Sequence, residues 1–182
     1  MFDLQGLNIY IIGMMGSGKS TVGPLLAKHL GYSFLDTDTT IEKLVGQSVT
    51  EIFQTVGETE FRQIETQVLA EVSAHLRLVV ATGGGIAIER ENWNHLHQGL
   101  VIWLDPHVEI LVERLQGDTT RPLLASADLS SKLTAILSER RHRYSEADIQ
   151  VSIDRNLTAE EIIDRILAAI PTVLKAPIAI PD

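Results

Sequence analysis

The sequence predicts an α/β fold in which helices cover both faces of a mostly parallel sheet. Two observations support this class. Short apolar runs rich in β-prone residues alternate along the whole chain with segments whose apolar residues recur at helical spacing. A glycine-rich loop joins the first apolar run to the first helical segment. Because the helices between parallel strands cover the faces of the sheet, this alternation is typical of an α/β protein.

The elements follow in order. Residues 7–12 are apolar and β-prone and predict a buried strand, and residues 19–30 predict a helix, because Val22 and Leu26 lie at helical spacing and Gly31 can close its end. The remaining predicted strands span 33–35, 78–81, 100–104 and 149–153. The remaining predicted helices span 38–46, 50–55, 58–76, 107–115, 130–145 and 158–169.

The chain shows no linker between two domains, so we expect one domain over residues 1–170. Residues 116–128 lack clear periodicity and predict a long loop, which in a compact domain is often a mobile lid. A tail over residues 171–182 holds three prolines and is expected to fray.

Composition narrows the class of protein. Apolar residues make up 45% and charged residues 21% of the 182 residues, as in an ordinary globular domain. The absence of an 18-residue apolar run argues against a membrane span, and a net charge of −9 argues against a nucleic-acid partner. There is no cysteine and no signal or transit peptide is visible. We therefore expect a cytoplasmic protein, as a monomer.

The glycine-rich loop from Gly13 to Ser20 fits the phosphate-binding pattern G-x-x-x-x-G-K-[ST] at every fixed position. Glycines let successive backbone N–H groups point at phosphate oxygens. Lys19 supplies a positive charge for the β and γ phosphates, and Ser20 supplies a hydroxyl for Mg²⁺. A simple turn is the alternative, but a strand before the loop and a helix after it favour nucleotide binding. The predicted nucleotide-binding residues here are Gly16, Ser17, Gly18, Lys19, Ser20 and Thr21.

Two carboxylates follow the second predicted strand. Asp36 and Asp38 lie at its carboxyl end, where ligands gather in α/β sheets. On an extended backbone they would share a face. One could hold Mg²⁺ and the other could contact a substrate hydroxyl. Alternatively, Asp38 caps the next helix.

Further candidates each have a structural alternative. Gly83–Gly85 suit a close approach of the backbone to a ligand, or form a flexible turn. Arg62 and Glu65 share a helix face and could grip a carboxylate, or form a solvated ion pair. Arg121, in the predicted lid, could neutralise a transferring phosphate, or be solvated.

Two further features, in the C-terminal half of the chain, each have a functional and a structural interpretation. Arg140–Arg143 is a basic cluster whose alternative role is to complement the negative end of a helix. Asp105 could hold a metal in the manner of a Walker B aspartate, but we favour a cap for the next helix, with Pro106 at the first helical position.

In combination these motifs resemble shikimate kinase, from residue 7 to about residue 165. The phosphate loop is shared by many kinases. More specific are Asp36-Thr37-Asp38, Phe61-Arg62 with Glu65, Gly83-Gly84-Gly85, Arg121-Pro122-Leu123-Leu124, and Arg140 four residues before Tyr144.

The resemblance implies a P-loop kinase fold: a three-layer sandwich with five parallel strands in the order 2-3-1-4-5 and a substrate-binding region at about 37–65. It implies transfer of the γ-phosphoryl group of ATP to the 3-hydroxyl of shikimate, on the route to chorismate and the aromatic amino acids. It also implies roles for single residues. Arg62 and Arg140 would bind the shikimate carboxylate, and Asp38 with the Gly83, Gly84 and Gly85 backbone would contact its hydroxyls. Ser20 and Asp36 would hold Mg²⁺, and Lys19, Asp38 and Arg121 would act in catalysis. Arg114 would stack near adenine, with the loop at about 154–158 on the other side of the ring.

Two alternatives differ in function. A kinase for another metabolite, such as gluconate or a nucleoside monophosphate, would keep the phosphate loop but need not carry the other motifs. A non-catalytic nucleotide-binding module would be expected to lose one of Lys19, Asp36, Asp38 and Arg121, and all four are present.

Overall fold

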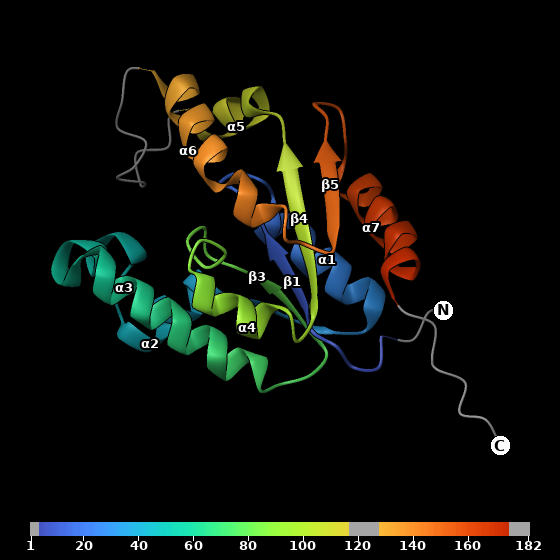
Figure 1. Cartoon of the computed structure of the whole chain (residues 1–182), viewed down its shortest axis with the longest axis horizontal. Coiled ribbons are helices and arrows are strands. Elements are labelled where there is room, and N and C mark those ends of the chain that lie inside the picture. Colours follow the sequence, from blue (N-terminus) through green and yellow to red (C-terminus); the bar gives the residue numbers. More distant parts are fainter. Residues whose placement is uncertain (1–3, 117–127, 175–182) are drawn as a thin grey trace.

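The computed structural model describes residues 4–116 and 128–174. These residues form a five-stranded parallel sheet in the order β2-β3-β1-β4-β5, as predicted (Figure 1). The strands are β1 (Ile9–Ile12), β2 (Ser33–Asp36), β3 (Leu78–Ala81), β4 (Leu100–Pro106) and β5 (Ile149–Ile153). The helices are α1 (Lys19–Leu30), α2 (Thr37–Val45), α3 (Val49–Ser73), α4 (Trp93–Leu96), α5 (Val108–Leu115), α6 (Leu129–Tyr144) and α7 (Ala159–Val173), with a 3-10 turn η1 (Arg90–Asn92) before α4.

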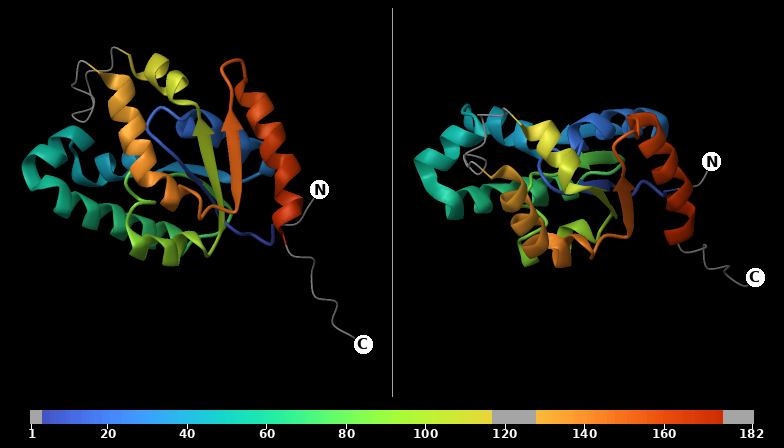
Figure 2. Two further views of the ribbon diagram at one scale, coloured as in Figure 1. Left: turned by 45° about the horizontal axis from the view of Figure 1, so that its top comes forward. Right: turned by 90° about the horizontal axis from the view of Figure 1, so that it is seen from above.

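The sheet separates two apolar cores, and β1 contributes alternate side chains to each. Ile9 and Ile11 pack with buried residues of α1 and α7, whereas Tyr10 and Ile12 pack with buried residues of α3, α4 and α6. All four side chains are fully buried. Figure 2 shows the corresponding layers, with α1 and α7 on one face of the sheet. Burial on both faces explains why the strand sequence is continuously apolar instead of alternating.

Three loops meet at one edge of the sheet because their strands are in register. Ala81 at the end of β3 pairs with Ile11 on one side and with Asp36 on the other. The segments that follow β1, β2 and β3 therefore leave the sheet side by side. They are the phosphate loop, the Asp36–Asp38 turn and the glycine loop (Gly83–Gly85).

Several elements of the structure differ from the prediction. The segment η1–α4 was not predicted. Helix α7 runs to Val173, four residues past the predicted end at 169. The two helices predicted on either side of Gly57 are present, and they join into α3, with Gly57 in a non-helical conformation (φ 84°, ψ 174°). The remainder of the predicted tail, residues 175–182, lies outside the described residues.

Asp105 is neither the helix cap that we favoured nor part of the phosphate-binding cavity. Strand β4 continues through Pro106, which pairs with Ile153, so α5 begins at Val108, two residues after Pro106, with His107 at its N-cap. The Asp105 carboxylate instead accepts hydrogen bonds from Arg141 and Gln150.

Candidate functional site

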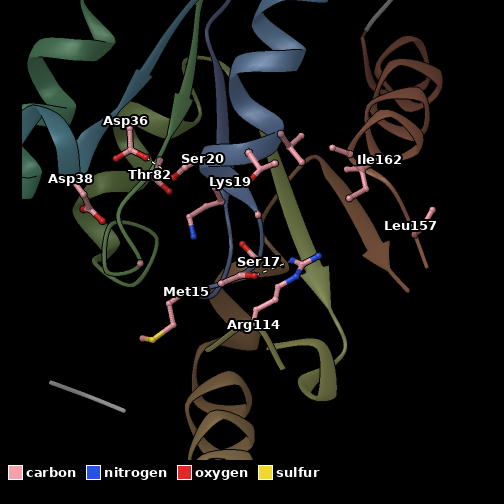
Figure 3. Close-up of a pocket in the computed structure, with 16 residues that line it drawn as sticks. Met15, Ser17, Lys19, Ser20, Asp36, Asp38, Thr82, Arg114, Leu157 and Ile162 are labelled. Carbon is pink, nitrogen blue, oxygen red and sulfur yellow. Dashed lines mark hydrogen bonds between the residues drawn. The ribbon is translucent and has the colours of Figure 1, made fainter. Parts of the chain in front are cut away.

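A cavity of about 440 Å³ lies at the carboxyl edge of the sheet. Figure 3 shows the side chains around it: Asp36 and Asp38 lie on one side of the phosphate loop, and Arg114, Leu157 and Ile162 lie on the other. The predicted nucleotide-binding residues Gly16, Ser17, Gly18, Lys19, Ser20, Thr21 and Arg114 all line it, as do Asp36, Asp38 and Gly84.

Two glycines of the phosphate loop occupy positions that suit only a residue without a side chain. Gly13 (φ 139°) has no room for a side chain, because a Cβ there would lie 2.6 Å from the Leu104 carbonyl oxygen. Gly18 is the N-cap of α1 and adopts φ 102°, a conformation that favours glycine. Helix α1 has no side-chain cap and no acidic residue in its first turn. No side chain therefore caps the positive end of α1, which leaves its N–H groups available to an anion in the cavity.

Lys19 folds back over this loop. Its Nζ donates hydrogen bonds to the carbonyl oxygens of Gly13 and Met14, at 2.8 and 2.9 Å. The ammonium group is thereby held at the mouth of the loop, where the β and γ phosphates of a nucleotide would lie.

The side chains of Ser20 and Asp36, which were predicted to hold Mg²⁺, are in contact with each other. The Ser20 hydroxyl donates a hydrogen bond of 2.7 Å to Asp36 Oδ2, which lies 16 residues further along the chain. The other oxygen of Asp36 accepts a hydrogen bond from the Thr39 N–H at 3.2 Å, which makes Asp36 the N-cap of α2. The alternative that assigned the cap to Asp38 is therefore wrong. Helix α2 begins directly after β2, so Asp38 lies in its first turn and not on extended backbone, although both carboxylates still face the cavity.

Arg62 and Glu65 form a buried pair behind the glycine loop. Arg62 donates to Glu65 at 2.5 Å and to Glu58 at 3.0 Å. Only 17% of the Arg62 side chain and 2% of the Glu65 side chain are exposed, so the solvated ion pair considered as an alternative is wrong. The Arg62 guanidinium also lies over the ring of Phe53, 5.6 Å from its centroid.

The pKa values of Arg62 and Glu65 are both shifted from their ordinary values. Burial raises the pKa of Glu65 to about 7, an effect that its ion pair with Arg62 only partly offsets and that the nearby Asp38 and Glu89 reinforce. Burial lowers the pKa of the Arg62 guanidinium, but Glu65 and Glu58 outweigh this effect, so its pKa is raised and it stays charged. A permanent cation next to a carboxyl group that titrates near neutrality marks a candidate binding site.

The glycine loop fits between these side chains. A Cβ on Gly83 would lie 2.5 Å from Asp38 Oδ1 and 2.6 Å from Glu65 Oε1, and a Cβ on Gly85 would overlap the Arg62 guanidinium. A Cβ on Gly84 would meet nothing within 4 Å. The outer glycines therefore allow the loop to approach Asp38, Glu65 and Arg62 closely, and the middle glycine exposes its backbone to the cavity.

Arg140 joins the same group from α6. Its Nη1 donates to the Gly84 carbonyl at 3.2 Å, although Arg140, Arg62, Gly83 and Gly85 do not themselves line the cavity. The neighbouring basic residues have other partners: Arg141 pairs with Asp105, and Arg143 pairs with Glu146. Of the four residues in the basic cluster, Arg140 is thus the one directed at the glycine loop.

Arg114 closes the opposite side of the cavity. Its Nη1 donates to the Gly16 carbonyl at 3.0 Å, and Leu157 faces it from the segment before α7. Leu157 and Ile162 were not predicted as site residues, and the expected adenine-binding segment at about 154–158 was the signal that could have found Leu157. Arg121 and most of the predicted lid lie outside the described residues.

Comparisons with known proteins agree with this geometry. The family model described as "Shikimate kinase" matches residues 15–171. A shikimate kinase of Rippkaea orientalis is 56% identical over 172 residues, which cover 94% of this chain and 92% of that protein. One of Nostoc punctiforme is 54% identical, with 94% and 95% coverage.

A solved structure gives the same result. Shikimate kinase from Acinetobacter baumannii in complex with shikimate matches with a TM-score of 0.85 and 38% identity, over 93% of this chain and 95% of that one. The sequence match, the fold and the arrangement of the cavity all point to one family rather than to another class of small-molecule kinase. The chain therefore belongs to the shikimate kinase family.

Proposed function

We propose that the cavity holds ATP and shikimate side by side and that the chain transfers the γ-phosphoryl group of ATP to the 3-hydroxyl of shikimate, giving ADP and shikimate 3-phosphate. The observation that carries this proposal is the meeting of two different sets of groups. The phosphate loop with Ser20 and Asp36 suits a nucleotide, and Asp38 with the glycine loop and two arginines suits a small hydroxylated acid.

The nucleotide side consists of residues 16–21 and Arg114. Backbone N–H groups of the loop and the positive end of α1 would bind phosphate oxygens. Lys19 would leave its carbonyl partners and neutralise the β and γ phosphates. Arg114 and Leu157 both line the cavity on this side of the phosphate loop and are placed to contact the adenine ring.

Ser20 and Asp36 fit a Mg²⁺ ion. A hydroxyl and a carboxylate are the hard oxygen ligands that Mg²⁺ prefers, and it normally takes its other ligands from water and phosphate. Within residues 4–116 and 128–174, no three His, Cys, Asp or Glu side chains gather as a metal site built from protein alone would need. Held by Ser20 and Asp36, Mg²⁺ would supply positive charge that neutralises the phosphates of ATP during transfer.

The acceptor side consists of Asp38, the glycine loop, Arg62 and Arg140. Shikimate carries one carboxylate and three hydroxyls. The planar guanidinium groups match the carboxylate, and Glu65 holds Arg62 in orientation. Asp38 and the exposed backbone at Gly84 match the hydroxyls.

The chemistry follows from this arrangement. The 3-hydroxyl oxygen forms a bond to the γ-phosphorus while the bond from that phosphorus to the β–γ bridging oxygen breaks. Asp38 orients the hydroxyl and takes its proton late in the transfer. Lys19 stabilises the charge that grows on the bridging oxygen. A catalytic role for Arg121, on the transferring phosphoryl group, stays a prediction from the sequence.

The proposal also includes the location, the partners and the oligomeric state of the protein. None of the helices in the described part of the chain has both the length and the hydropathy to span a bilayer. A cytoplasmic monomer without a nucleic-acid or membrane partner is the state that the sequence predicts, and sedimentation of the purified protein with and without ligands would test the monomer.

A panel of acceptors tests the function. With ATP and Mg²⁺ fixed, we expect rapid ADP release with shikimate and little with shikimate methyl ester, gluconate or a nucleoside monophosphate. The ester keeps all three hydroxyls and lacks only the negative charge, so it is the matched control for the two arginines. Equal rates with shikimate and its ester would contradict the carboxylate site, and a higher rate with gluconate would contradict the choice of substrate.

A further inference from the structure

Thr37, between the two site carboxylates, is completely buried and has no assigned role. It is the first residue of α2. Its Oγ1 accepts a hydrogen bond of 2.7 Å from the backbone N–H of Gly83, which is 46 residues away in the chain. This bond joins the Asp36–Asp38 turn directly to the glycine loop.

The bond acts at the residue of the glycine loop that lies beside Asp38. A Cβ on Gly83 would clash with the carboxylates of Asp38 and Glu65, so the backbone lies close to both. One residue further on, Gly84 lines the cavity and its carbonyl accepts the Arg140 hydrogen bond. A shift of the Gly83 N–H would therefore move the backbone next to Asp38 and the partner of Arg140 together.

The anchoring of the loop is unequal along its length. Residue 82 is fixed twice to β1, because both the N–H and the hydroxyl of Thr82 donate to the Ile11 carbonyl, at 3.1 and 3.0 Å. After that point the loop leaves the sheet, and the Gly83 N–H is held by the Thr37 side chain. A buried N–H that loses its acceptor is strongly disfavoured, so without this hydroxyl the loop would move toward another partner.

We propose that Thr37 is a positioning residue for the acceptor: its hydroxyl sets the distance between Asp38 and the glycine loop and so aligns the shikimate hydroxyls for transfer. This inference rests on the proposed function. Thr37 does not line the cavity and acts through Gly83. Because Gly83 and Asp38 belong to the acceptor side, the effect falls on shikimate and spares ATP.

Two substitutions separate the hydroxyl from the shape of the side chain. Thr37→Val keeps the branched shape and removes the acceptor, and Thr37→Ser keeps the acceptor and removes the methyl group. We expect Thr37→Val to lower kcat/KM for shikimate about 10- to 100-fold, the range for an unpaired buried group. Its KM for ATP should stay within about twofold, and Thr37→Ser should retain most of kcat/KM.

A destabilised control excludes a general effect of lost stability. Ile166 is completely buried in α7, in the core on the other face of the sheet, and Ile166→Val should lower the urea midpoint while leaving both KM values unchanged. Should Thr37→Val not fold, Thr37→Ala gives the same comparison at a temperature below its unfolding transition.

The outcomes are distinct. A Thr37→Val variant that loses stability like Ile166→Val but keeps the wild-type kcat and KM for shikimate overturns the positioning role. Equal losses in Thr37→Val and Thr37→Ser also overturn it, because the hydroxyl would then be irrelevant. A wild-type protein that does not phosphorylate shikimate overturns the proposed function itself, and the Thr37 inference with it.

Discussion

Removal of Arg140 tests the acceptor site with the least disturbance to the fold. In the described part of the chain Arg140 meets the Gly84 carbonyl and the buried Tyr144 hydroxyl, which are both neutral, so its loss leaves no buried charge without a partner there. If its guanidinium binds the shikimate carboxylate, Arg140→Ala removes charge-assisted hydrogen bonds of about 1.5–3 kcal/mol. At about 1.4 kcal/mol per factor of ten, shikimate binding should weaken roughly 10- to 150-fold.

Arg62→Ala should combine the same loss of affinity with a loss of stability. Its partner Glu65 is buried and would keep only the unfavourable effects of burial and of Asp38. Breaking a buried pair from one side costs about 3–5 kcal/mol, and protonation of the stranded carboxyl group reduces that cost. The variant should therefore unfold at lower denaturant concentration, whereas Arg140→Ala should not.

Calorimetric titration of each variant with shikimate, and separately with a non-hydrolysable ATP analogue, measures both effects. Nucleotide affinity should change less than about threefold in either variant, since neither arginine lies on the nucleotide side. Arg143→Ala is the matched control, because Arg143 lies in the same turn of α6 and pairs only with the nearby Glu146 among the interactions described here. Equal weakening of shikimate and nucleotide binding would refute the division of the cavity into two sides.

Three further predictions concern catalysis and pH. Lys19→Ala should keep the fold and lose most turnover, because a loop lysine contributes little to the core; a near-native rate at saturating ATP would contradict the phosphate-loop assignment. Asp38→Asn should lose turnover even at saturating shikimate, whereas the defect of Asp36→Asn should be partly relieved by raised Mg²⁺; rescue of the Asp38 variant instead would show that the two roles are reversed. Burial raises the pKa of Glu65 from 4.5 to about 7, so the native state binds more protons than the unfolded chain between these values, and the contribution of Glu65 to the free energy of unfolding falls as pH rises from about 4.5 to about 7. In urea titrations across this range Glu65→Gln should remove that fall, and an unchanged pH slope would show that Glu65 does not titrate there.

Much of the fold could be predicted because local signals agree with the tertiary structure. The strands β1, β3 and β4 are apolar runs buried on both faces. The capping box of Ser48 with Glu51 and the break at Gly57 are both visible in the sequence. The segment η1–α4 has no such signal. It is held by side-chain bonds to backbone carbonyls six residues earlier, from Asn92 to Ile86 and from Trp93 to Ala87, which no periodicity reveals.

The candidate site was predictable as a set of residues but not as a geometry. Spacing alone could not show that Arg62 and Glu65 are buried, because their position on the helix says nothing of the glycine loop that covers them. The sequence also could not decide which aspartate caps α2, since that depends on the strand ending directly at Asp36. In the sequence Thr37 is only the residue between two carboxylates, and its contact with Gly83 arises from the pairing of β2 with β3.

The rate of ADP release from ATP and Mg²⁺, measured with and without shikimate, tests the central claim most directly. The arrangement of the cavity predicts a slow rate with ATP alone and an increase of several orders of magnitude when shikimate is added, with one shikimate 3-phosphate formed for each ADP. A rate that does not change on addition of shikimate, or ADP formed without the phosphorylated acid, would contradict the claim that this cavity joins a nucleotide site to a shikimate site.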